Sequence, residues 1–173
     1  LALLNGSHSL LAYAATILGH ETVADAIADP RCLAWVEQWW DEACAHILLP
    51  AADLTAYRQA LLERYRNPNI RHALAQIASD GSLKLGVRIL PTLRAELAEG
   101  RMPQGAVRAV AAWVQHLRGL GARVKDVAAA EVLALAEGTL EETVTAVLAF
   151  LDADLAANEG LRAAVLAQSV NLA

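Results

Sequence analysis

Apolar residues along this chain recur three and four positions apart, which places them on one face of an α-helix. In the segment 103–117 the positions with this spacing are Val107, Val110, Ala111, Val114 and Leu117. No segment sustains a heptad repeat, and this argues against a long coiled coil. The pattern therefore predicts a globular domain built only from short helices.

Capping and turn residues divide the chain at helix-like intervals. Ser7 is placed to cap the first helix, and Thr139 with Glu142 has the spacing of a capping box. Pro91 is expected to kink or split a later helix. We therefore predict an all-α fold of about nine short helices, joined by tight turns in one globular domain over residues 1–173.

The composition agrees with the helical pattern. The 173 residues include 38 alanines and 29 leucines, both strong helix formers, but only 10 glycines and 5 prolines. This composition argues against a β-sandwich, a disulfide scaffold and a disordered chain. A chain of this length can also bury a substantial core.

Charge and cysteine content narrow the class of protein. The formal net charge is −5 with no basic tract, so we expect no nucleic-acid partner. The longest apolar run is far shorter than the roughly 20 residues that a membrane span needs, so we expect no membrane partner. Cys32 and Cys44 match neither a disulfide framework nor a metal-binding spacing, and the histidines are scattered. We expect no metal, and two buried thiols in a cytoplasmic protein.

One candidate site is the polar segment Asn5-Gly6-Ser7-His8. Asn5 and His8 are three residues apart and share a face of a helical turn, so an amide and an imidazole can both hydrogen-bond one ligand oxygen. Gly6 permits the close approach of another segment or of a ligand. On these residues alone, an ordinary capped helix start with a packed histidine explains the same pattern.

A second candidate is Lys84, which follows the tight turn Asp80-Gly81-Ser82. The lysine falls in the first turn of its helix, where the helix dipole disfavours a cation. An anionic or oxygen-rich partner would compensate for that position. A solvated lysine beside a capping Asp80 or Ser82 is the alternative.

Both segments resemble the mannitol dehydrogenase family, the polyol-specific long-chain dehydrogenases. The segment Leu3-Leu4-Asn5-Gly6-Ser7-His8-Ser9 is similar to the active-site motif of that family. Further motifs follow in family order: Asp53-Leu54-x-x-Tyr57, Leu61-Leu62-Glu63-Arg64-Tyr65, Asn67-Pro68-x-x-Arg71-His72, Gln76-Ile77-Ala78 and Asp80-Gly81-Ser82-x-Lys84-Leu85. The resemblance covers nearly the whole chain, and it is strong to about Arg94 and loose after Gly119.

The resemblance implies a helical C-terminal substrate domain that belongs to a longer enzyme. Members of the family carry an N-terminal Rossmann-type domain that binds NAD or NADP, and they use no metal. They move a hydride between this cofactor and a secondary alcohol of a sugar alcohol or sugar acid. Their general base is a lysine that would fall immediately before Leu1, so we expect this chain alone to be inactive.

Residue roles follow from the same resemblance. Asn5 and His8 are implied to be catalytic, because Asn5 would stabilise the developing alkoxide and His8 would bind the same oxygen or its neighbour and orient the substrate. Lys84 and Gln76 are implied to bind the substrate. Mannitol-type members tend to carry arginine where this chain has Gln76, which, with Arg71-His72, favours the fructuronate reductase (mannonate oxidoreductase) branch. Mannonate and fructuronate are then expected as substrates ahead of mannitol and fructose.

We expect the partners to be a small sugar alcohol or sugar acid and the chain's own N-terminal Rossmann domain, in a monomer. The competing hypothesis is a non-catalytic helical module that binds a ligand or another protein. The two hypotheses differ in geometry. The enzyme requires Asn5, His8 and Lys84 to converge, whereas the binding module leaves them scattered.

Overall fold

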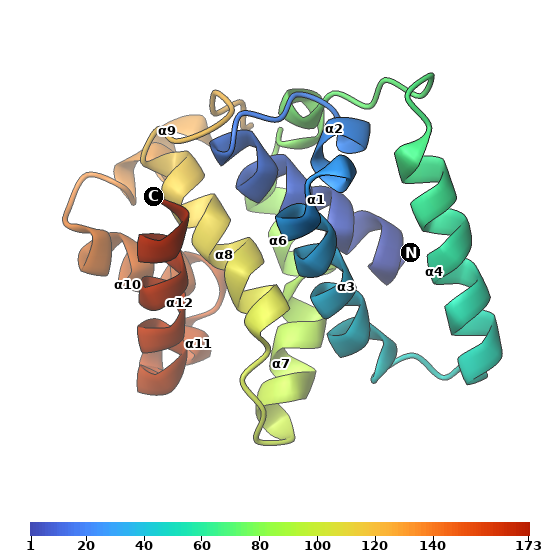
Figure 1. Cartoon of the computed structure of the whole chain (residues 1–173). Helices are drawn as coiled ribbons and strands as arrows, with labels where there is room; N and C mark the ends of the chain where they lie inside the picture. Colours follow the sequence, from blue (N-terminus) through green and yellow to red (C-terminus); the bar gives the residue numbers. More distant parts are fainter.

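The computed structural model describes residues 1–173, and its regular structure is entirely helical (Figure 1). The helices are α1 (Ala2–Ile17), α2 (Val23–Ala28), α3 (Pro30–Cys44), α4 (Ala51–Arg66), α5 (Leu74–Ile77), α6 (Gly81–Arg88), α7 (Leu90–Ala98), α8 (Gln104–Leu117), α9 (Ala129–Ala134), α10 (Leu140–Leu151), α11 (Ala153–Ala157) and α12 (Glu159–Leu172). The backbone pairs in the manner of a β-sheet at one place, an isolated bridge between Thr22 and Ala73. The predicted all-α fold is confirmed.

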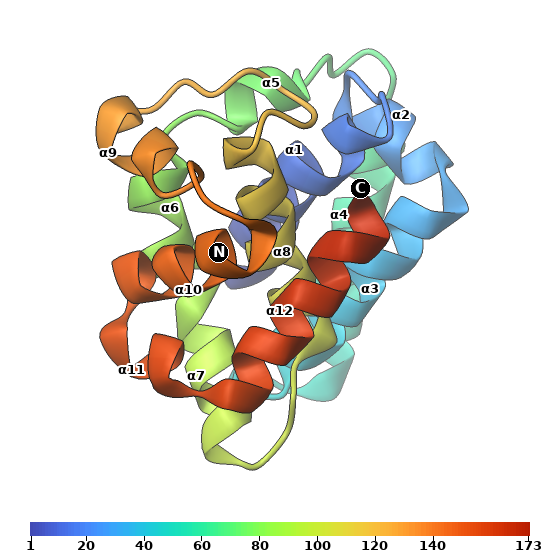
Figure 2. The same cartoon turned by 90° about the vertical axis from the view of Figure 1, so that its left-hand side faces the viewer.

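Two central helices carry much of the core. Every residue of α1 from Ser9 to Ala15 is buried, and so is every residue of α8 from Ala109 to Leu117. Small alanine side chains are frequent in both stretches, and they let helix axes approach closely. The two helices pack against each other, with α3 on α1 and α12 on α8 (Figures 1 and 2).

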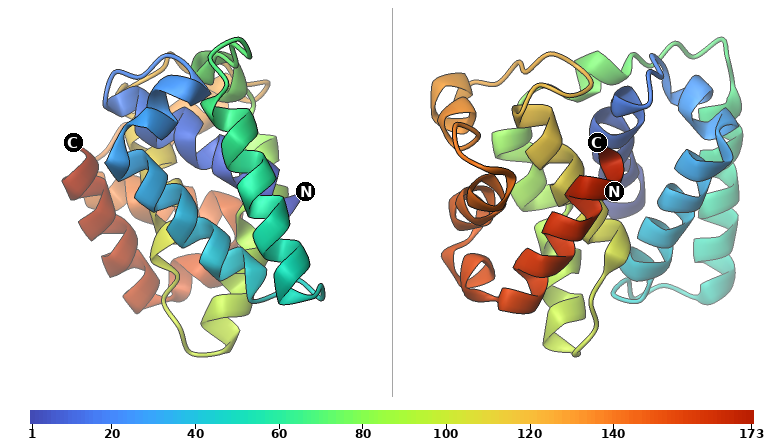
Figure 3. Two further views of the ribbon diagram at one scale, coloured as in Figure 1. Left: turned by 45° about the vertical axis from the view of Figure 1, so that its right-hand side comes forward. Right: turned by 60° about the vertical axis from the view of Figure 1, so that its left-hand side comes forward.

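Peripheral helices flank this centre on two sides. The α4 helix forms one edge of the molecule, and the segment from α9 to α11 forms the opposite edge (Figures 1 and 3). Although α4 is one of the longest helices, it buries only Leu61 and Tyr65. No helix combines the length and the apolar character that crossing a membrane requires.

Local rules predicted several helix ends. Thr139 and Glu142 form the expected capping box at the start of α10, with each side chain accepting the other's backbone N–H at 3.2 and 2.8 Å. Pro91 splits the predicted helix, because α6 ends at Arg88 and α7 begins at Leu90. At the second position of α7 the missing N–H of proline costs no hydrogen bond.

The predicted cap at Ser7 is wrong. The helix begins at Ala2 and runs through this segment, so the Ser7 hydroxyl lies inside it and donates to the carbonyl of Leu3 at 2.6 Å. A serine inside a helix commonly bonds to the carbonyl four residues earlier. The consequence is that Asn5 and His8 both belong to regular helix.

Candidate active site at the start of α1

Asn5 and His8 lie on one face of the first turns of α1, and both are half-buried. The Nε2 atom of His8 is buried and has no hydrogen-bond partner in the protein. Buried polar atoms are almost always paired, so an unpaired one indicates a ligand or water that completes it. The geometry therefore leaves this imidazole nitrogen available for a bound oxygen.

The His8 ring is positioned by residues from distant segments. The ring of Tyr65, in the last turn of α4, stacks on it with centroids 5.1 Å apart, and His72 meets it edge-on at 5.7 Å. The Tyr65 hydroxyl lies 2.8 Å from Ser7 Oγ and also donates to the carbonyl of Leu4 at 3.3 Å. Our sequence reasoning assigned Tyr65 and Ser7 no role here, although both fall in the motifs that carried the resemblance.

Close packing on α3 fixes the start of α1. A Cβ atom added to Gly6 would lie 2.2 Å from Cζ2 of Trp39, a distance that no real contact allows. The neighbouring Trp40 donates from Nε1 to the carbonyl of Leu3 at 3.0 Å. The prediction that Gly6 permits close approach is therefore confirmed, and the neighbour is a tryptophan of another helix.

A sharp corner between α5 and α6 faces the same helix. Asp80 adopts the left-handed conformation with φ 59°, and α6 starts at the next residue. A Cβ on Gly81 would lie 2.4 Å from Nε1 of Trp113 and 2.6 Å from the Tyr13 hydroxyl. Tyr13 also donates to the carbonyl of Ala78 at 2.9 Å. Side chains of α1 and α8 thus fix the position of this corner.

Lys84 lies in the first turn of α6 and is half-buried. Its Nζ donates to the carbonyl of Ile77, at the end of α5, at 3.1 Å. This carbonyl is an oxygen partner of the kind that the position in the helix led us to expect. Burial, and then the charge of Arg88, lower the pKa of Lys84.

Arg88 follows Lys84 by one helical turn and brings α6 against α1. Its Nη1 donates to the hydroxyl of Ser9 at 3.3 Å, and Ser9 is the residue after His8. Four-residue spacing places Lys84 and Arg88 on one face of α6. The structure therefore links Lys84 to the neighbourhood of His8 through Arg88.

The surroundings of His8 are cationic. Burial is the main cause that lowers its pKa to about 4, and the charges of His72, Arg88 and Arg64 lower it further. The imidazole is therefore neutral near pH 7. A neutral ring can donate one hydrogen bond and accept another, which suits it to orient a substrate hydroxyl.

Gln76 lies on α5, next to the residue whose carbonyl binds Lys84, and its side chain is exposed. The short helix α5 packs against α1, as α6 does. The structure thus places Asn5 and His8 on α1 and Lys84 on α6, two helices that are in contact, with Gln76 exposed on the neighbouring α5.

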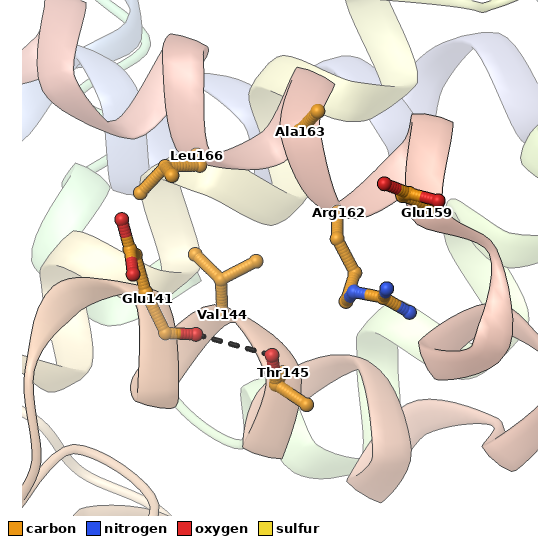
Figure 4. Close-up of a pocket in the computed structure, with 7 residues that line it drawn as sticks. All are labelled: Glu141, Val144, Thr145, Glu159, Arg162, Ala163 and Leu166. Carbon is orange, nitrogen blue, oxygen red and sulfur yellow. Dashed lines mark hydrogen bonds between the residues drawn. The ribbon is translucent and has the colours of Figure 1, made fainter.

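A separate surface groove lies between α10 and α12 (Figure 4). It has a volume of about 270 Å³, and its lining residues are Glu141, Val144, Thr145, Glu159, Arg162, Ala163 and Leu166. Thr145 donates to the carbonyl of Glu141 at 3.1 Å, which is an ordinary bond within a helix. The groove contains none of the predicted site residues.

His20, Asp29 and Cys32 bring three possible metal ligands within 4.8 Å of one another. Sequence spacing did not indicate this cluster, because helix α2 separates His20 from the start of α3. Arg31 already binds both oxygens of Asp29, at 3.1 and 2.7 Å. Burial raises the pKa of the Cys32 thiol to about 12. Asp29 is already engaged by Arg31 and by His20 Nε2, which lies 3.0 Å from its second oxygen.

Fold and site together define a class of protein. Residues 1–172 match the family model described as the mannitol dehydrogenase C-terminal domain, so the chain belongs to the mannitol dehydrogenase family. The resemblance found in the sequence is thereby confirmed.

Individual relatives are oxidoreductases. D-mannonate oxidoreductase of Escherichia coli K12 is 38% identical over 122 residues, which are 69% of this chain and 25% of that protein. Altronate oxidoreductase of Klebsiella pneumoniae (strain 342) is 38% identical over 120 residues, 68% of this chain and 25% of that protein.

Solved structures agree with this assignment. Mannitol 2-dehydrogenase of Pseudomonas fluorescens, in a ternary complex with NAD and D-mannitol, matches with a TM-score of 0.87 at 28% identity, over 98% of this chain and 36% of that chain. A D-sorbitol dehydrogenase in substrate-free form shares the fold, with a TM-score of 0.78 at 21% identity. The chain spans only about a third of these enzymes, with 36% of each covered.

Proposed function

We propose that this chain is the substrate domain of an NAD(P)-dependent, metal-independent oxidoreductase that interconverts a sugar acid or sugar alcohol with its keto form. The observation that carries the proposal is the buried Nε2 atom of His8, which has no protein partner and shares a helix face with Asn5. Membership of the mannitol dehydrogenase family supports it. The proposed enzyme also contains an N-terminal Rossmann-type domain.

Binding of the reacting hydroxyl group is the role we assign to Asn5 and His8. The Asn5 amide donates a hydrogen bond to this oxygen and stabilises the negative charge that develops when its proton leaves. His8, neutral and stacked on Tyr65, binds the same oxygen through Nε2 and fixes its orientation. We place the general base, a lysine, immediately before Leu1.

The cofactor NAD or NADP supplies the hydride acceptor and is bound mainly by the N-terminal domain. The unpaired His8 nitrogen fits a hydroxyl oxygen on the carbon that faces this cofactor.

We assign the binding of substrate oxygens further along the carbon chain to Lys84 and Gln76. Lys84 is anchored by the carbonyl of Ile77, which limits its motion. Gln76 has an exposed amide that can donate and accept. With a glutamine rather than an arginine at this position, we favour mannonate and fructuronate as the substrate pair. The 38% identity to D-mannonate oxidoreductase supports this choice.

The test is an Asn5→Ala substitution in the full-length enzyme. We expect kcat with D-mannonate to fall by about 10²–10³-fold, the loss typical of removing one donor to a developing oxyanion. The matched control is Asn171→Ala, since Asn171 is exposed near the end of α12. Full turnover in Asn5→Ala would overturn the proposed role.

A further inference from the structure

Two cations on α6, Lys84 and Arg88, lie one turn apart beside the proposed site. Both are half-buried. Arg88 reaches α1 with one hydrogen bond, from Nη1 to the hydroxyl of Ser9 at 3.3 Å. One neutral hydroxyl satisfies one of the five N–H groups of a guanidinium and none of its charge.

No carboxylate lies within salt-bridge distance of either cation. The ion pairs of the structure include neither Lys84 nor Arg88. Asp80 and Asp126 are the acidic groups close enough to raise the pKa of Lys84, but neither forms an ion pair with it, and each accepts a backbone N–H at 2.9 Å. The arginines that do have a carboxylate partner are Arg31, Arg58, Arg94 and Arg101.

The cationic surroundings contrast with the chain as a whole, whose formal net charge is −5. Arg64 adds to the positive character around His8. Withdrawing a guanidinium from water without an opposing charge costs free energy, so such a group is unfavourable unless a ligand supplies the anion. The arrangement therefore indicates an anionic ligand at α6.

We propose that Arg88 and Lys84 together bind the carboxylate of a sugar acid, and that Arg88 makes the enzyme prefer aldonates to alditols. This inference rests on the proposed function of the same site. An aldonate and the alditol of equal length differ only at one end, where a carboxylate replaces a CH₂OH group. A guanidinium can bind that carboxylate through two parallel hydrogen bonds, whereas it gains no charge pairing from a hydroxyl.

The geometry suits a ligand that spans both helices. The reacting oxygen lies at Asn5 and His8 on α1, and the carboxylate lies at the other end of the carbon chain, on α6. Contact between α1 and α6, closed by the Ser9–Arg88 bond, fixes the distance between the two ends. Orientation of both ends of the substrate makes the hydride transfer effectively intramolecular.

The experiment compares D-mannonate with D-mannitol on the full-length enzyme and on three variants. In Arg88→Gln we expect kcat/KM for mannonate to fall by about 100-fold, as for loss of a charged hydrogen-bonding pair, and kcat/KM for mannitol to change by less than about 3-fold. Arg88→Lys, which keeps the charge without the planar fork, is expected to give an intermediate loss for mannonate only. The control Arg123→Gln removes an exposed arginine and is expected to change neither.

Three results would overturn the inference: an equal loss on both substrates, no loss on either, or a weaker affinity for NAD with an unchanged substrate ratio. An equal loss on both substrates would mean that Arg88 serves packing alone. A weaker affinity for NAD would mean that Arg88 binds a phosphate of the cofactor and not the carboxylate of the substrate. Arg88→Lys keeps the test decisive where Arg88→Gln fails to fold.

Calorimetric titration with mannonate and mannitol separates this inference from the proposed function, because it needs no turnover. If the enzyme oxidises neither compound, the proposed function fails. Mannonate binding that exceeds mannitol binding, and that Arg88→Gln abolishes, would still support the anion site. Equal binding of the two compounds to the unaltered enzyme would overturn it.

Discussion

His8 and His46 both lie beside arginines, but only His46 shares its surroundings with carboxylates. Nε2 of His46, which follows α3, lies 2.6 Å from Glu96 of α7, and Arg101 lies 2.6 Å from the same carboxylate. His8 stacks on Tyr65 beside Arg88, and its Nε2 has no partner. The His46–Glu96 contact joins the segment after α3 to α7, whereas the neutral His8 keeps an unpaired nitrogen that can bind a ligand.

The largest expected effect is on activity, at His8. In His8→Ala of the full-length enzyme, kcat is expected to fall by about 10²–10³-fold, because the contact that we propose between His8 and the reacting oxygen is lost. The matched substitution His46→Ala is expected to retain kcat, since its partner Glu96 still pairs with Arg101. Steady-state kinetics at saturating cofactor measures both. A comparable loss of kcat in His46→Ala would break the comparison.

The next effect is on stability, at Glu96. This carboxylate is 5% exposed and accepts from both His46 and Arg101. Glu96→Ala is expected to lower the free energy of unfolding by about 2 kcal/mol, because it removes the buried carboxylate that His46 and Arg101 share and leaves them only the exposed Glu99. Urea unfolding measures this loss, and Glu137→Ala, at an exposed position, is the control. The variant is expected to keep its kcat.

The dependence of stability on pH is a second way to test the role of Glu96. The hydrogen bond from Arg101 is the main cause that lowers the pKa of Glu96 from 4.5 to about 2, with His46 adding to it against the effect of burial. A carboxyl group with a lower pKa in the folded state stabilises the fold above its unfolded pKa. That stabilisation is complete above about pH 4.5 and lost as the pH falls toward 2. Melting temperatures across this range are expected to fall less steeply in Glu96→Gln.

The smallest effect is expected at Tyr65. In Tyr65→Phe the ring still stacks on His8, but the contact of the hydroxyl with Ser7 at 2.8 Å is lost. One neutral hydrogen bond contributes about 1 kcal/mol, so kcat is expected to fall by about 3- to 10-fold. Tyr57→Phe, on the same helix and partly exposed, is the control. A loss as large as that of His8→Ala would mean that the hydroxyl itself contacts the substrate.

The sequence alone predicted those features of the site that depend on residues close together in the chain. Asn5 and His8 share a face because they are three residues apart, and the prediction that Lys84 needs an oxygen partner followed from its place in a helical turn. Their catalytic and substrate-binding roles remain predictions. The error at Ser7 was local too, since the pattern could not show that the helix starts at Ala2.

Other features required the packed molecule. Tyr65 lies 58 residues from Ser7 in sequence, and Arg88 lies 79 residues from Ser9. Helical periodicity relates positions within a few turns and does not specify which distant helices meet. The stack on His8 and the unpaired charge of Arg88 therefore became visible only after α1, α4 and α6 were placed together.

The weak attachment of α4 has a consequence for how the enzyme would fail on warming. This long helix buries two side chains, and one of them, Tyr65, carries the ring that orients His8. Segments with few buried contacts open at a lower free energy than the core does. Heat would then detach this helix from the domain and disturb His8 before most of the other helices unfold. Turnover of the proposed full-length enzyme is therefore expected to be lost at a lower temperature than most of its helical circular dichroism signal.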